Sequence, residues 1–366
     1  MNNNIDKTGN KNIIRIVIIA IITVILITIL SCFVWYFNSI SAVDKSNENE
    51  IEIEIPEGSY ATKIADILLE NNLIKSKKAF KIYIRLNNST DLKAGTYYLK
   101  QNMSLKDIIN TIKSGNNSQK NITYIEGKNI RWLAKEIAKT TNNSEEDVYN
   151  LLKNEEYIDS LIEKYWFLTD DIKDENIYYP LEGYLFPDTY SIKSKNTSVE
   201  DIFEKMLDEM ENTLEEYKEL IEEKGYNVNK ILTVASIIEM ESMTEEGRKD
   251  VSSVIYNRLS KGMAIQSDVT TYYAFKIDVG ERDLYQQEIN TYNPYNTRGP
   301  NMEGKLPIGP ISSVSKSSID AALNPNSTEY IFFVADKNGK LYFSKTNEEH
   351  NEIINNLQDE GLWYEY

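Results

Sequence analysis

The longest apolar run of the chain lies near its N-terminus, where Ile16 to Phe37 contains no charged residue. At about 1.5 Å of rise per residue, a helix over this run is roughly 33 Å long, enough to cross the hydrocarbon core of a bilayer. Basic residues precede the run and acidic residues follow it: Lys7, Lys11 and Arg15 on one side, Asp44, Glu48 and Glu50 on the other. The positive-inside rule therefore predicts a transmembrane helix at 16–37, with residues 1–15 in the cytoplasm and the rest of the chain outside.

Two alternatives to an uncleaved anchor are open from the residues alone. A cleaved signal peptide has a shorter apolar core and a small-residue cleavage site, whereas this run ends in the bulky Trp35, Tyr36 and Phe37. The segment 29–32, Ile-Leu-Ser-Cys, loosely resembles a lipoprotein cleavage site, but the apolar run continues beyond it. The pattern favours an uncleaved anchor, followed by a polar stalk at 38–50.

The next part of the chain, 51–117, is predicted to be a small module of strands and helices. Ile51 to Ile55 alternates apolar and acidic residues with period two, which is typical of a half-buried strand. Ser104 with Asp107 resembles a capping box, and Gly115 is placed to end the helix that follows. Strands are therefore predicted at 51–55 and 94–99, and helices at 61–71, 77–86 and 104–112.

Residues 118–366 are predicted to form a larger mixed domain. Its part 140–230 is mostly helical and acidic, but the aromatic segment 178–190 contains two prolines and a glycine and cannot be a regular helix. That segment either packs on the core or forms a wall of a sugar-binding cleft, because aromatic rings suit the apolar faces of pyranoses. Further elements are predicted beyond it: a helix from Asn229, a helix from Glu246 to Leu259, and a β-hairpin around Asn338-Gly339. The fold class is therefore α+β, with an N-terminal membrane helix, a small α+β module and a larger mixed α+β domain.

Composition narrows the chemistry that the outer part can perform. The 366 residues include 40 basic and 57 acidic ones, and the net charge of −17 argues against a nucleic-acid ligand, which needs a basic face. A single cysteine, Cys32, and a single histidine, His350, exclude a disulfide framework, a cysteine-rich zinc site and a Cys–His nucleophile pair. A Ser-His-Asp triad would have to use His350, which lies in a polar tail. Catalysis is therefore expected to rest on carboxylates, hydroxyls and amides, without a metal or cofactor.

Two carboxylates interrupt an apolar helical run at 234–242, Val-Ala-Ser-Ile-Ile-Glu-Met-Glu-Ser. A glutamate at the edge of a buried face is either solvated or kept protonated by burial, and a raised pKa suits a general acid. At about 100° per residue, Glu239 and Glu241 lie about 160° apart and each about 80° from the centre of the apolar stripe. The spacing does not choose between them, and two solvated carboxylates flanking the core are the plainer interpretation.

A series of short segments follows a distinctive order along the outer part. They are the module at 51–117, LEGYLFPDTY at 181–190, ASIIEMES at 235–242, YNRL at 256–259, IQSD at 265–268, PYNT at 294–297, LPIGPI at 306–311 and YIFFV at 330–334. This order resembles the YceG-like (MltG) family of endolytic murein transglycosylases. The resemblance implies a LysM-like module at 51–117 and a catalytic domain at 118–366. Two departures are visible: Met240 stands where a lysine is common, and the stretch 298–305 is longer than usual.

The resemblance implies a mechanism that needs one carboxylate, with Glu241 as the catalytic acid and Glu239 as a supporting group. Glu241 would protonate the oxygen that links N-acetylmuramic acid to N-acetylglucosamine. Its carboxylate would then take the proton of the sugar's C6 hydroxyl, whose tethered attack closes a 1,6-anhydro ring. Motif position makes four residues candidates for substrate binding: Gln266, Asp268, Tyr295 and Asn296. The family further implies action on nascent strands beside wall-synthesising polymerases, as a terminase of strand elongation.

Two other functions stay open. A hydrolytic muramidase would use Asp268 or Glu239 as a second carboxylate and would leave reducing ends instead of anhydro ends. A membrane-anchored peptidoglycan-binding module without catalysis would depend on the LysM-like region alone. The chemistry of the product separates the first alternative from the transglycosylase. A Glu241→Gln chain that still binds glycan but no longer cuts it would argue against the second.

Overall fold

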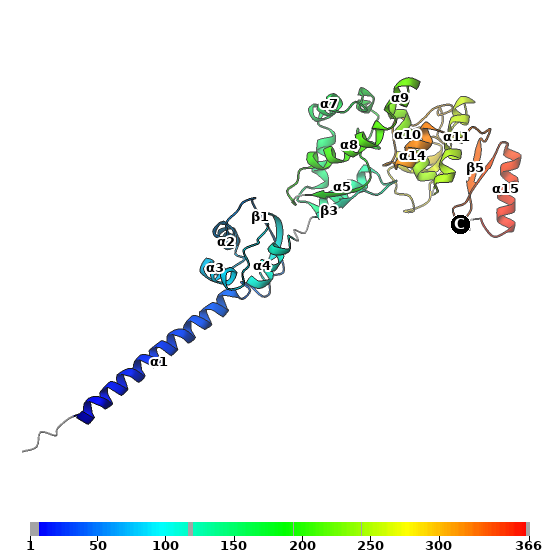
Figure 1. Cartoon of the computed structure of the whole chain (residues 1–366). Coiled ribbons are helices and arrows are strands. Elements are labelled where there is room, and N and C mark those ends of the chain that lie inside the picture. The colour runs from blue at the N-terminus through cyan, green and yellow to red at the C-terminus, as the bar shows by residue number, and fades with distance from the viewer. Residues whose placement is uncertain (1–6, 116–119, 193, 243, 364–366) are drawn as a thin grey trace, which may run out of the picture. The chain divides into compact units, whose positions relative to one another are not determined.

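The computed structural model describes residues 7–115, 120–192, 194–242 and 244–363. The chain forms two compact units, which divide after Lys120 (Figure 1). Helices and two-stranded sheets occur in both units, with β1 and β2 in the small unit and the hairpin of β5 and β6 in the large one. The mixed helix and strand content predicted from the sequence is therefore confirmed.

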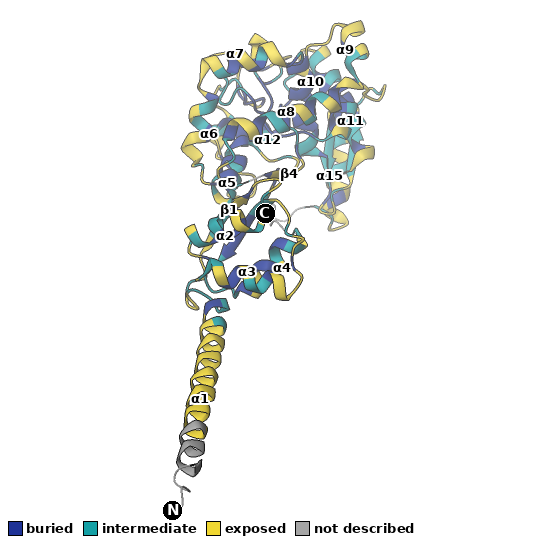
Figure 2. Cartoon of the chain, turned by 60° about the vertical axis from the view of Figure 1, so that its left-hand side comes forward, coloured by how far each residue is buried: buried dark blue, intermediate teal, exposed yellow. Residues whose placement is uncertain are grey.

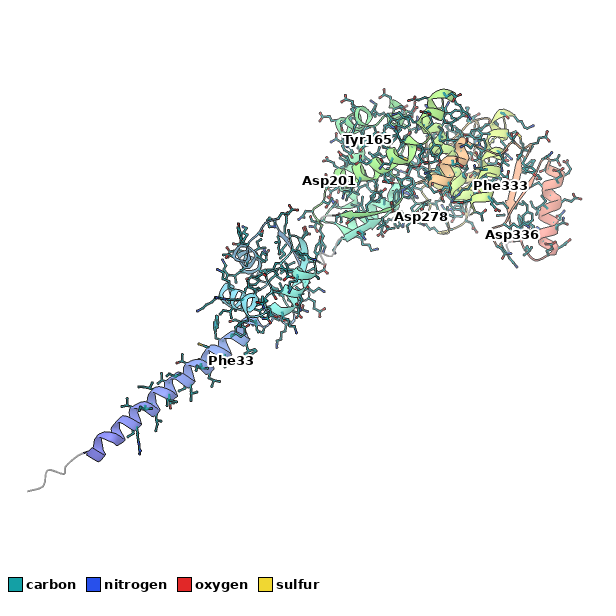
Figure 3. The ribbon with its side chains drawn as sticks, in the orientation of Figure 1. Phe33, Tyr165, Asp201, Asp278, Phe333 and Asp336 are labelled. Carbon is teal, nitrogen blue, oxygen red and sulfur yellow. The ribbon has the colours of Figure 1, made fainter. Side chains whose placement is uncertain are left out.

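Helix α1, Lys7–Ile40, contains the long apolar run. Within the described residues it is the one helix long and apolar enough to cross a membrane, over Arg15–Ile40. Its large apolar side chains are exposed along the run, and Phe33 projects from it (Figures 2 and 3). Such a continuous apolar surface is unfavourable in water, so the helix requires apolar surroundings.

The rest of the small unit has the element order βααβα around a compact core. Its elements are β1 Glu50–Ile55, α2 Ala61–Glu70, α3 Lys77–Leu86, β2 Gly95–Lys100 and α4 Leu105–Ser114. The strands pair antiparallel, with Glu50 opposite Lys100 and Ile55 opposite Gly95. Alternate residues of β1 point inward, and Ile53 and Ile55 join a core formed with the three helices. The period-two pattern of the sequence thus predicted the buried face of β1.

Two local features of the small unit can be compared with their predictions. Ser104 and Asp107 form the predicted capping box of α4, and Gly115 ends the helix in a left-handed conformation with φ 68°. The segment 38–50, predicted as a stalk, is hydrogen-bonded to the module. The Asp44 amide donates to the Gln101 carbonyl at 3.1 Å, and the Asn47 side chain donates to that of Gln101 at 2.8 Å. This segment therefore lies along the module.

The large unit is predominantly helical. Its elements are β3 Lys120–Thr123, α5 Ile130–Thr140, α6 Glu145–Leu152, α7 Glu155–Lys164, the 3₁₀ turn η1 Asp170–Lys173, β4 Thr189–Ile192, α8 Val199–Glu215, α9 Lys218–Lys224, α10 Val228–Glu241, α11 Glu245–Ser260, α12 Asp268–Ala274, α13 Gln286–Ile289, α14 Lys316–Leu323, β5 Phe332–Ala335, β6 Leu341–Ser344 and α15 Asn347–Asp359. Strands β3 and β4 form one two-stranded sheet, and β5 and β6 form another. The helices predicted from Asn229 and at 246–259 are α10 and α11, within two residues at each stated end.

Helix α10 lies at the centre of the large unit. Every described residue from Val228 to Ile238 except Lys230 is buried, and α10 is mostly dark blue in Figure 2. The helix packs against α11, α12 and α14. A helix that is apolar on almost every side is a core helix. The last turn of α10 leaves this core, and both glutamates belong to that turn.

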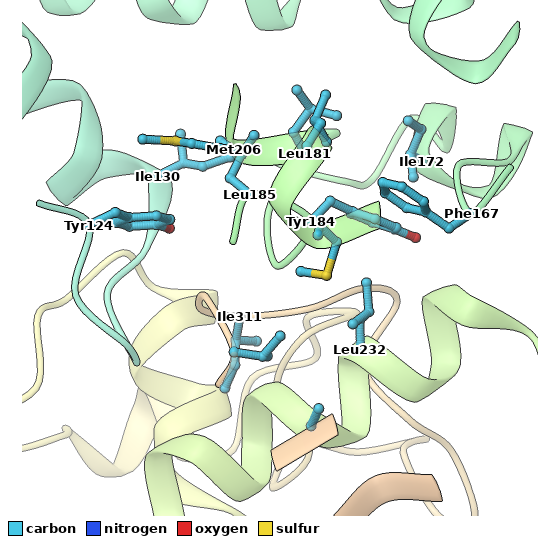
Figure 4. Close-up of a cluster of buried hydrophobic side chains, with 14 of the residues drawn as sticks. Tyr124, Ile130, Phe167, Ile172, Leu181, Tyr184, Leu185, Met206, Leu232 and Ile311 are labelled. Carbon is cyan, nitrogen blue, oxygen red and sulfur yellow. The ribbon is translucent and has the colours of Figure 1, made fainter. Parts of the chain in front are cut away.

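The aromatic segment 178–190 packs on the core, the first of its two interpretations. Leu181, Tyr184 and Leu185 are at most 1% exposed and contact the same cluster as Leu232 (Figure 4). Gly183 has φ +80°, and a Cβ atom there would lie 2.3 Å from Pro310 Cβ. Only glycine combines this backbone conformation with so close an approach.

The C-terminal hairpin is confirmed. Strands β5 and β6 pair antiparallel with Ala335 opposite Leu341, and Gly339 adopts φ +81° in the turn. The Asp336 carboxylate accepts hydrogen bonds from the amides of Asn338 and Lys340 at 2.8 and 3.0 Å, which ties the turn together. One strand of this hairpin forms a wall of the cavity described next.

Candidate active site

Glu241 is the last residue of α10. The helix ends there because Ser242 turns to an extended conformation, while its amide still donates to the Ile238 carbonyl at 2.9 Å. Ser242 is buried, and its hydroxyl donates to the Thr244 carbonyl at 2.9 Å, just before α11 begins. This hydrogen bond links the end of α10 to the residue that caps α11.

The Glu241 carboxylate accepts one short hydrogen bond. Ser267 Oγ donates to Glu241 Oε1 at 2.5 Å, and Ser267 is only 6% exposed. Ser267 is held in turn by two threonines. Its amide donates to Thr297 Oγ1 at 3.0 Å, and its carbonyl accepts from Thr270 Oγ1 at 2.7 Å. The hydroxyl that meets Glu241 therefore has a fixed position.

The pKa of Glu241 is raised above its ordinary value. Burial of the carboxyl group is the largest cause, and the nearby charge of Asp268 acts in the same direction. The hydrogen bond from Ser267 and the charge of Arg298 lower the pKa, but burial prevails. A carboxyl group whose proton is retained closer to neutrality is suited to general acid catalysis.

A cavity of about 460 Å³ opens beside Glu241. Its lining comes from the ends of α10 and α11, the loop before α12, strand β5 and the C-terminal segment: Ile237, Glu241, Val254, Ile255, Arg258, Ile265 to Val269, Arg298, Ile331 to Ala335, His350 and Trp363. The volume is in the usual range of ligand pockets, which combine apolar walls with a few convergent polar groups. Here the polar groups are Glu241 with Ser267, Gln266 with Arg258, and Asp268 with Arg298, together with His350.

Gln266 and Asp268 line this cavity together with Glu241. The Gln266 side chain accepts a hydrogen bond from the guanidinium of Arg258 at 2.6 Å, and its backbone has φ 60°. Asp268 forms an ion pair with Arg298 at the cavity edge, where both side chains stay partly exposed. The structure therefore brings two of the four predicted substrate-binding residues to the catalytic candidate.

Tyr295 and Asn296 do not line the cavity, because both are fully buried. The Tyr295 hydroxyl accepts from the Tyr178 amide at 3.3 Å, and its ring packs between those of Tyr178 and Tyr273. The Asn296 amide group donates to three backbone carbonyls between 288 and 291, at 2.8 to 3.2 Å. Both side chains contact the loop that carries Thr297 and Arg298 and do not face the cavity, so a substrate contact by either stays a prediction.

Glu239 does not line the cavity, and both of its carboxylate oxygens accept hydrogen bonds. Its Oε1 accepts from the Arg248 guanidinium at 2.9 Å, and its Oε2 accepts from the amide and the hydroxyl of Ser315 at 2.9 and 2.5 Å. The side chain is 6% exposed, and that of Arg248 is 13% exposed. Glu239 thus joins α10 to α11 and to the N-terminus of α14.

Three cavity residues received no role in the sequence analysis. Ser267 and Arg258 lie within the motifs IQSD and YNRL, and Arg298 begins the lengthened stretch. The sequence holds one signal for Arg258, because the residue follows Val254 and Ile255 on the apolar side of its helix. In the structure Arg258 is 6% exposed. Its guanidinium also donates to the carbonyls of Ala264 and Ile331, both at 2.8 Å, which joins α11 to the cavity loop and to the start of β5.

The family of this chain follows from a comparison with known protein families. The sequence model of the YceG-like family matches residues 53–356, which cover the small module and nearly all of the large unit. The chain belongs to this family. The resemblance deduced from the ordered motifs is thereby confirmed.

Particular relatives carry a more specific name. The chain is 37% identical over 324 residues to the endolytic murein transglycosylase of Bacillus subtilis (strain 168), with 87% of this chain and 88% of the relative aligned. It is 30% identical over 338 residues to the endolytic murein transglycosylase of Streptococcus pneumoniae (strain D39), whose length it covers to 60%. A crystal structure of a putative YceG-like protein from Listeria monocytogenes superposes with a TM-score of 0.60 at 35% identity, covering 84% of this chain and all of that one.

Proposed function

We propose that this chain is an endolytic peptidoglycan lytic transglycosylase, an enzyme of the same class as its named relatives. It cleaves the bond between N-acetylmuramic acid and N-acetylglucosamine and leaves 1,6-anhydro ends. The observation that carries the proposal is the site of Glu241, a partly buried carboxyl group with a raised pKa that lines a cavity. The neighbouring Glu239 forms an ion pair with Arg248 and does not line that cavity. Glu241 is therefore the better candidate for the general acid.

In the first step, Glu241 donates its proton to the glycosidic oxygen as the bond to the muramic acid carbon breaks. The proton must be present at working pH, which the raised pKa favours. The hydroxyl of Ser267 then stabilises the carboxylate that forms, because it already donates to Oε1 at 2.5 Å. Positive charge develops on the sugar ring, and the adjacent carboxylates of Glu241 and Asp268 favour it.

In the second step, the C6 hydroxyl of the same sugar attacks the positively charged carbon. Glu241, now a carboxylate, takes the hydroxyl proton and returns to its starting form. The attack is intramolecular, so the effective concentration of the nucleophile is high and no second catalytic carboxylate is needed. Proton and bonds balance over the two steps: one glycosidic bond breaks, one anhydro bond forms, and the leaving sugar keeps the proton.

We assign substrate contacts to Gln266 and Asp268, which line the cavity. Gln266 presents its amide to the sugar while Arg258 holds its oxygen, and Asp268 is oriented by Arg298. Tyr295 and Asn296 act through the loop that they support, since neither side chain is exposed.

The anchor and the module fit action on new glycan at the membrane. Helix α1 would span the bilayer at 16–37, with residues 1–15 in the cytoplasm and the large unit outside. The module at 51–117 would be LysM-like and would hold glycan, and the domain from 118 onward would cut it. Cleavage next to the membrane would release strands from wall-synthesising polymerases and so terminate their elongation.

The decisive experiment is mass spectrometry of the products released from peptidoglycan by the full-length chain in nanodiscs. We expect anhydro-muramyl ends with the wild type and none with Glu241→Gln. Reducing ends would replace the proposal by a muramidase, a second candidate that the location of Asp268 in the same cavity favours. In that case Asp268→Asn should abolish cleavage, whereas a transglycosylase should retain a measurable rate.

A non-catalytic wall-binding protein is the remaining alternative. Pull-down of purified peptidoglycan by the wild type and by Glu241→Gln tests it beside the cleavage assay. Equal binding with cleavage only by the wild type supports the enzyme. Binding by both chains without cleavage by either would overturn the proposal.

A further inference from the structure

Helix α3 is basic in an otherwise acidic chain. The stretch 71–90 contains no aspartate or glutamate, whereas the net charge of the chain is −17. Lys77 pairs with Asp66 at 2.5 Å within the module. Lys78, Lys81 and Arg85 are exposed, so they present positive charge to whatever lies beside the helix.

Apolar side chains share the exposed side of α3. One face of the helix buries Ala79, Phe80 and Ile84 in the module core. On another side, Lys78, Ile82 and Leu86 recur every four positions and form one stripe. Leu86 is 70% exposed, which is unfavourable in water unless another apolar surface covers it.

This stripe borders an apolar groove between α3 and α1. The groove has a volume of about 690 Å³ and is lined by Lys78, Ile82 and Leu86 and by residues of α1 from Thr28 to Phe37. Lys78 Nζ of α3 lies 5.7 Å from the centroid of the Trp35 ring of α1. Just outside the two helices, Lys75 Nζ before α3 donates to Ser41 Oγ after α1 at 2.9 Å. Helix α3 is therefore fixed beside the C-terminal end of the apolar run.

We propose that this side of α3 is a membrane-binding surface for anionic phospholipids. Ile82 and Leu86 enter the acyl region beside α1, while Lys78, Lys81 and Arg85 bind lipid phosphate groups. The inference rests on the membrane anchoring proposed above, because α1 sets the level of the groove. From Phe37 to Thr28 the groove descends roughly 13 Å along α1, at about 1.5 Å per residue.

That depth covers the interface and the upper part of the hydrocarbon core, where apolar faces of interfacial helices settle. Lysine and arginine side chains at this level extend to the headgroups while their stems stay in apolar surroundings. Each basic residue near an anionic surface contributes about a fivefold preference for it. The position of the groove, continuous with a membrane helix, selects lipid as its occupant.

The surface would dock the small module directly on the outer leaflet. Two neighbouring helices would then fix the module, in place of one flexible tether. A glycan-binding module held in this way meets strands only where they emerge from the membrane.

Depth-dependent fluorescence quenching tests the proposal on the full-length chain in vesicles. A Cys32→Ser background removes the only cysteine. An environment-sensitive probe is then attached at Leu86→Cys, at Leu26→Cys in the middle of α1, or at Thr62→Cys, an exposed position of α2. In vesicles of phosphatidylcholine with phosphatidylglycerol, lipid-borne quenchers should quench the probes at 86 and 26, with emission shifted to the blue, and leave the probe at 62 unaffected.

A second part of the experiment tests the basic residues of α3. Replacing Lys78, Lys81 and Arg85 together by glutamine should reduce quenching at 86 toward the value at 62 in vesicles with phosphatidylglycerol. Quenching at 26 should not change, because α1 stays inserted. In vesicles of phosphatidylcholine alone, the wild-type probe at 86 should already be less quenched.

Each contrary result has a separate meaning. A probe at 86 that behaves like the one at 62 while 26 is quenched would overturn the lipid surface and leave the anchor standing. No quenching at 26 would overturn the anchor and the surface with it. A probe at 86 shielded from both water and lipid quenchers would mean that a protein helix fills the groove, which also overturns the proposal. Cleavage of peptidoglycan by the same chains reports separately on the catalytic function.

Discussion

The two sides of the final turn of α10 give two carboxylates opposite surroundings. Glu239 accepts hydrogen bonds from Arg248 and Ser315 and is nearly inaccessible. Glu241, two residues later, meets one serine hydroxyl and faces a cavity. Both oxygens of Glu239 are therefore engaged by protein donors, whereas burial raises the pKa of Glu241, which suits a proton that can leave and return. The difference shows that catalytic suitability lies in the partners supplied by other segments and not in the helix itself.

The largest effect is expected from Glu241→Gln. Loss of the proton donor should lower turnover of peptidoglycan by about 10² to 10⁴-fold, the usual range for a general acid. The melting temperature should stay the same or rise, because a buried carboxyl group is removed. Product release and thermal unfolding measure the two quantities. A variant that keeps more than about a tenth of the wild-type rate would contradict the role of Glu241.

Glu239→Gln should affect stability instead of chemistry. It leaves the guanidinium of Arg248, 13% exposed, without a carboxylate, and breaking such a pair costs about 3–5 kcal/mol. Urea unfolding measures this loss, and the molecules that remain folded at low temperature should still cleave. Glu204→Gln is the matched control, because its pair with Lys164 is about half exposed and should change stability by less than about 1 kcal/mol. Equal losses in both variants would contradict the structural role of Glu239.

Glu182 is a third buried carboxyl group, and its partners among the described residues are hydrogen-bond donors instead of an ion-pair partner. It is 1% exposed and accepts from the Ile130 amide at 3.1 Å and from the Tyr273 hydroxyl at 3.0 Å. Burial raises its pKa to about 8 from 4.5. The pKa of Glu182 is higher in the folded state than in the unfolded state. The stability that Glu182 contributes is therefore present at low pH and is lost as pH rises toward 8.

The free energy of unfolding should therefore fall by about 1.4 kcal/mol per pH unit between the two pKa values of Glu182, apart from other groups. Glu182→Gln should reduce this slope, because glutamine cannot ionise. Urea unfolding between pH 5 and pH 8 at about half-unit intervals compares the two chains. Parallel curves would show that Glu182 does not titrate in this range.

The smallest effect is expected on the pH dependence of the cleavage rate, and it tests the surroundings of Glu241 most directly. Two substitutions beside Glu241 should move the alkaline limb of the pH–rate profile in opposite directions. Ser267→Ala removes a hydrogen bond that lowers the pKa of Glu241, so the alkaline limb of the rate profile should move to higher pH. Asp268→Asn removes a charge that raises the same pKa, so the limb should move to lower pH. Shifts in the same direction would contradict the assignment of the limb to Glu241.

Local patterns in the sequence predicted secondary structure in both units. The alternation at 51–55, the cap at Ser104 and the Asn-Gly turn at 338–339 each correspond to an observed strand, helix start or hairpin. These features depend on neighbouring residues, which a sequence displays directly. The sequence left two interpretations of the aromatic segment at 178–190, because packing on a core and contact with a sugar require the same residue types.

The site was only partly predictable. Glu241, Gln266 and Asp268 were identified through resemblance and share one cavity. Tyr295 and Asn296 were identified on the same grounds but are fully buried, because a motif marks a loop and does not show which of its side chains face outward.

The sequence by itself determined the apolar helix, the fold class, the family and the exclusion of a disulfide framework, a cysteine-rich zinc site and a Cys–His nucleophile pair. The tertiary structure alone decided which glutamate can act as an acid. Ser267 reaches Glu241 from 26 residues away, and Ser315 reaches Glu239 from 76 residues away. Helical spacing placed the two carboxylates about equally far from the apolar stripe. Their difference arises from desolvation and hydrogen bonds, which depend on how distant segments pack together.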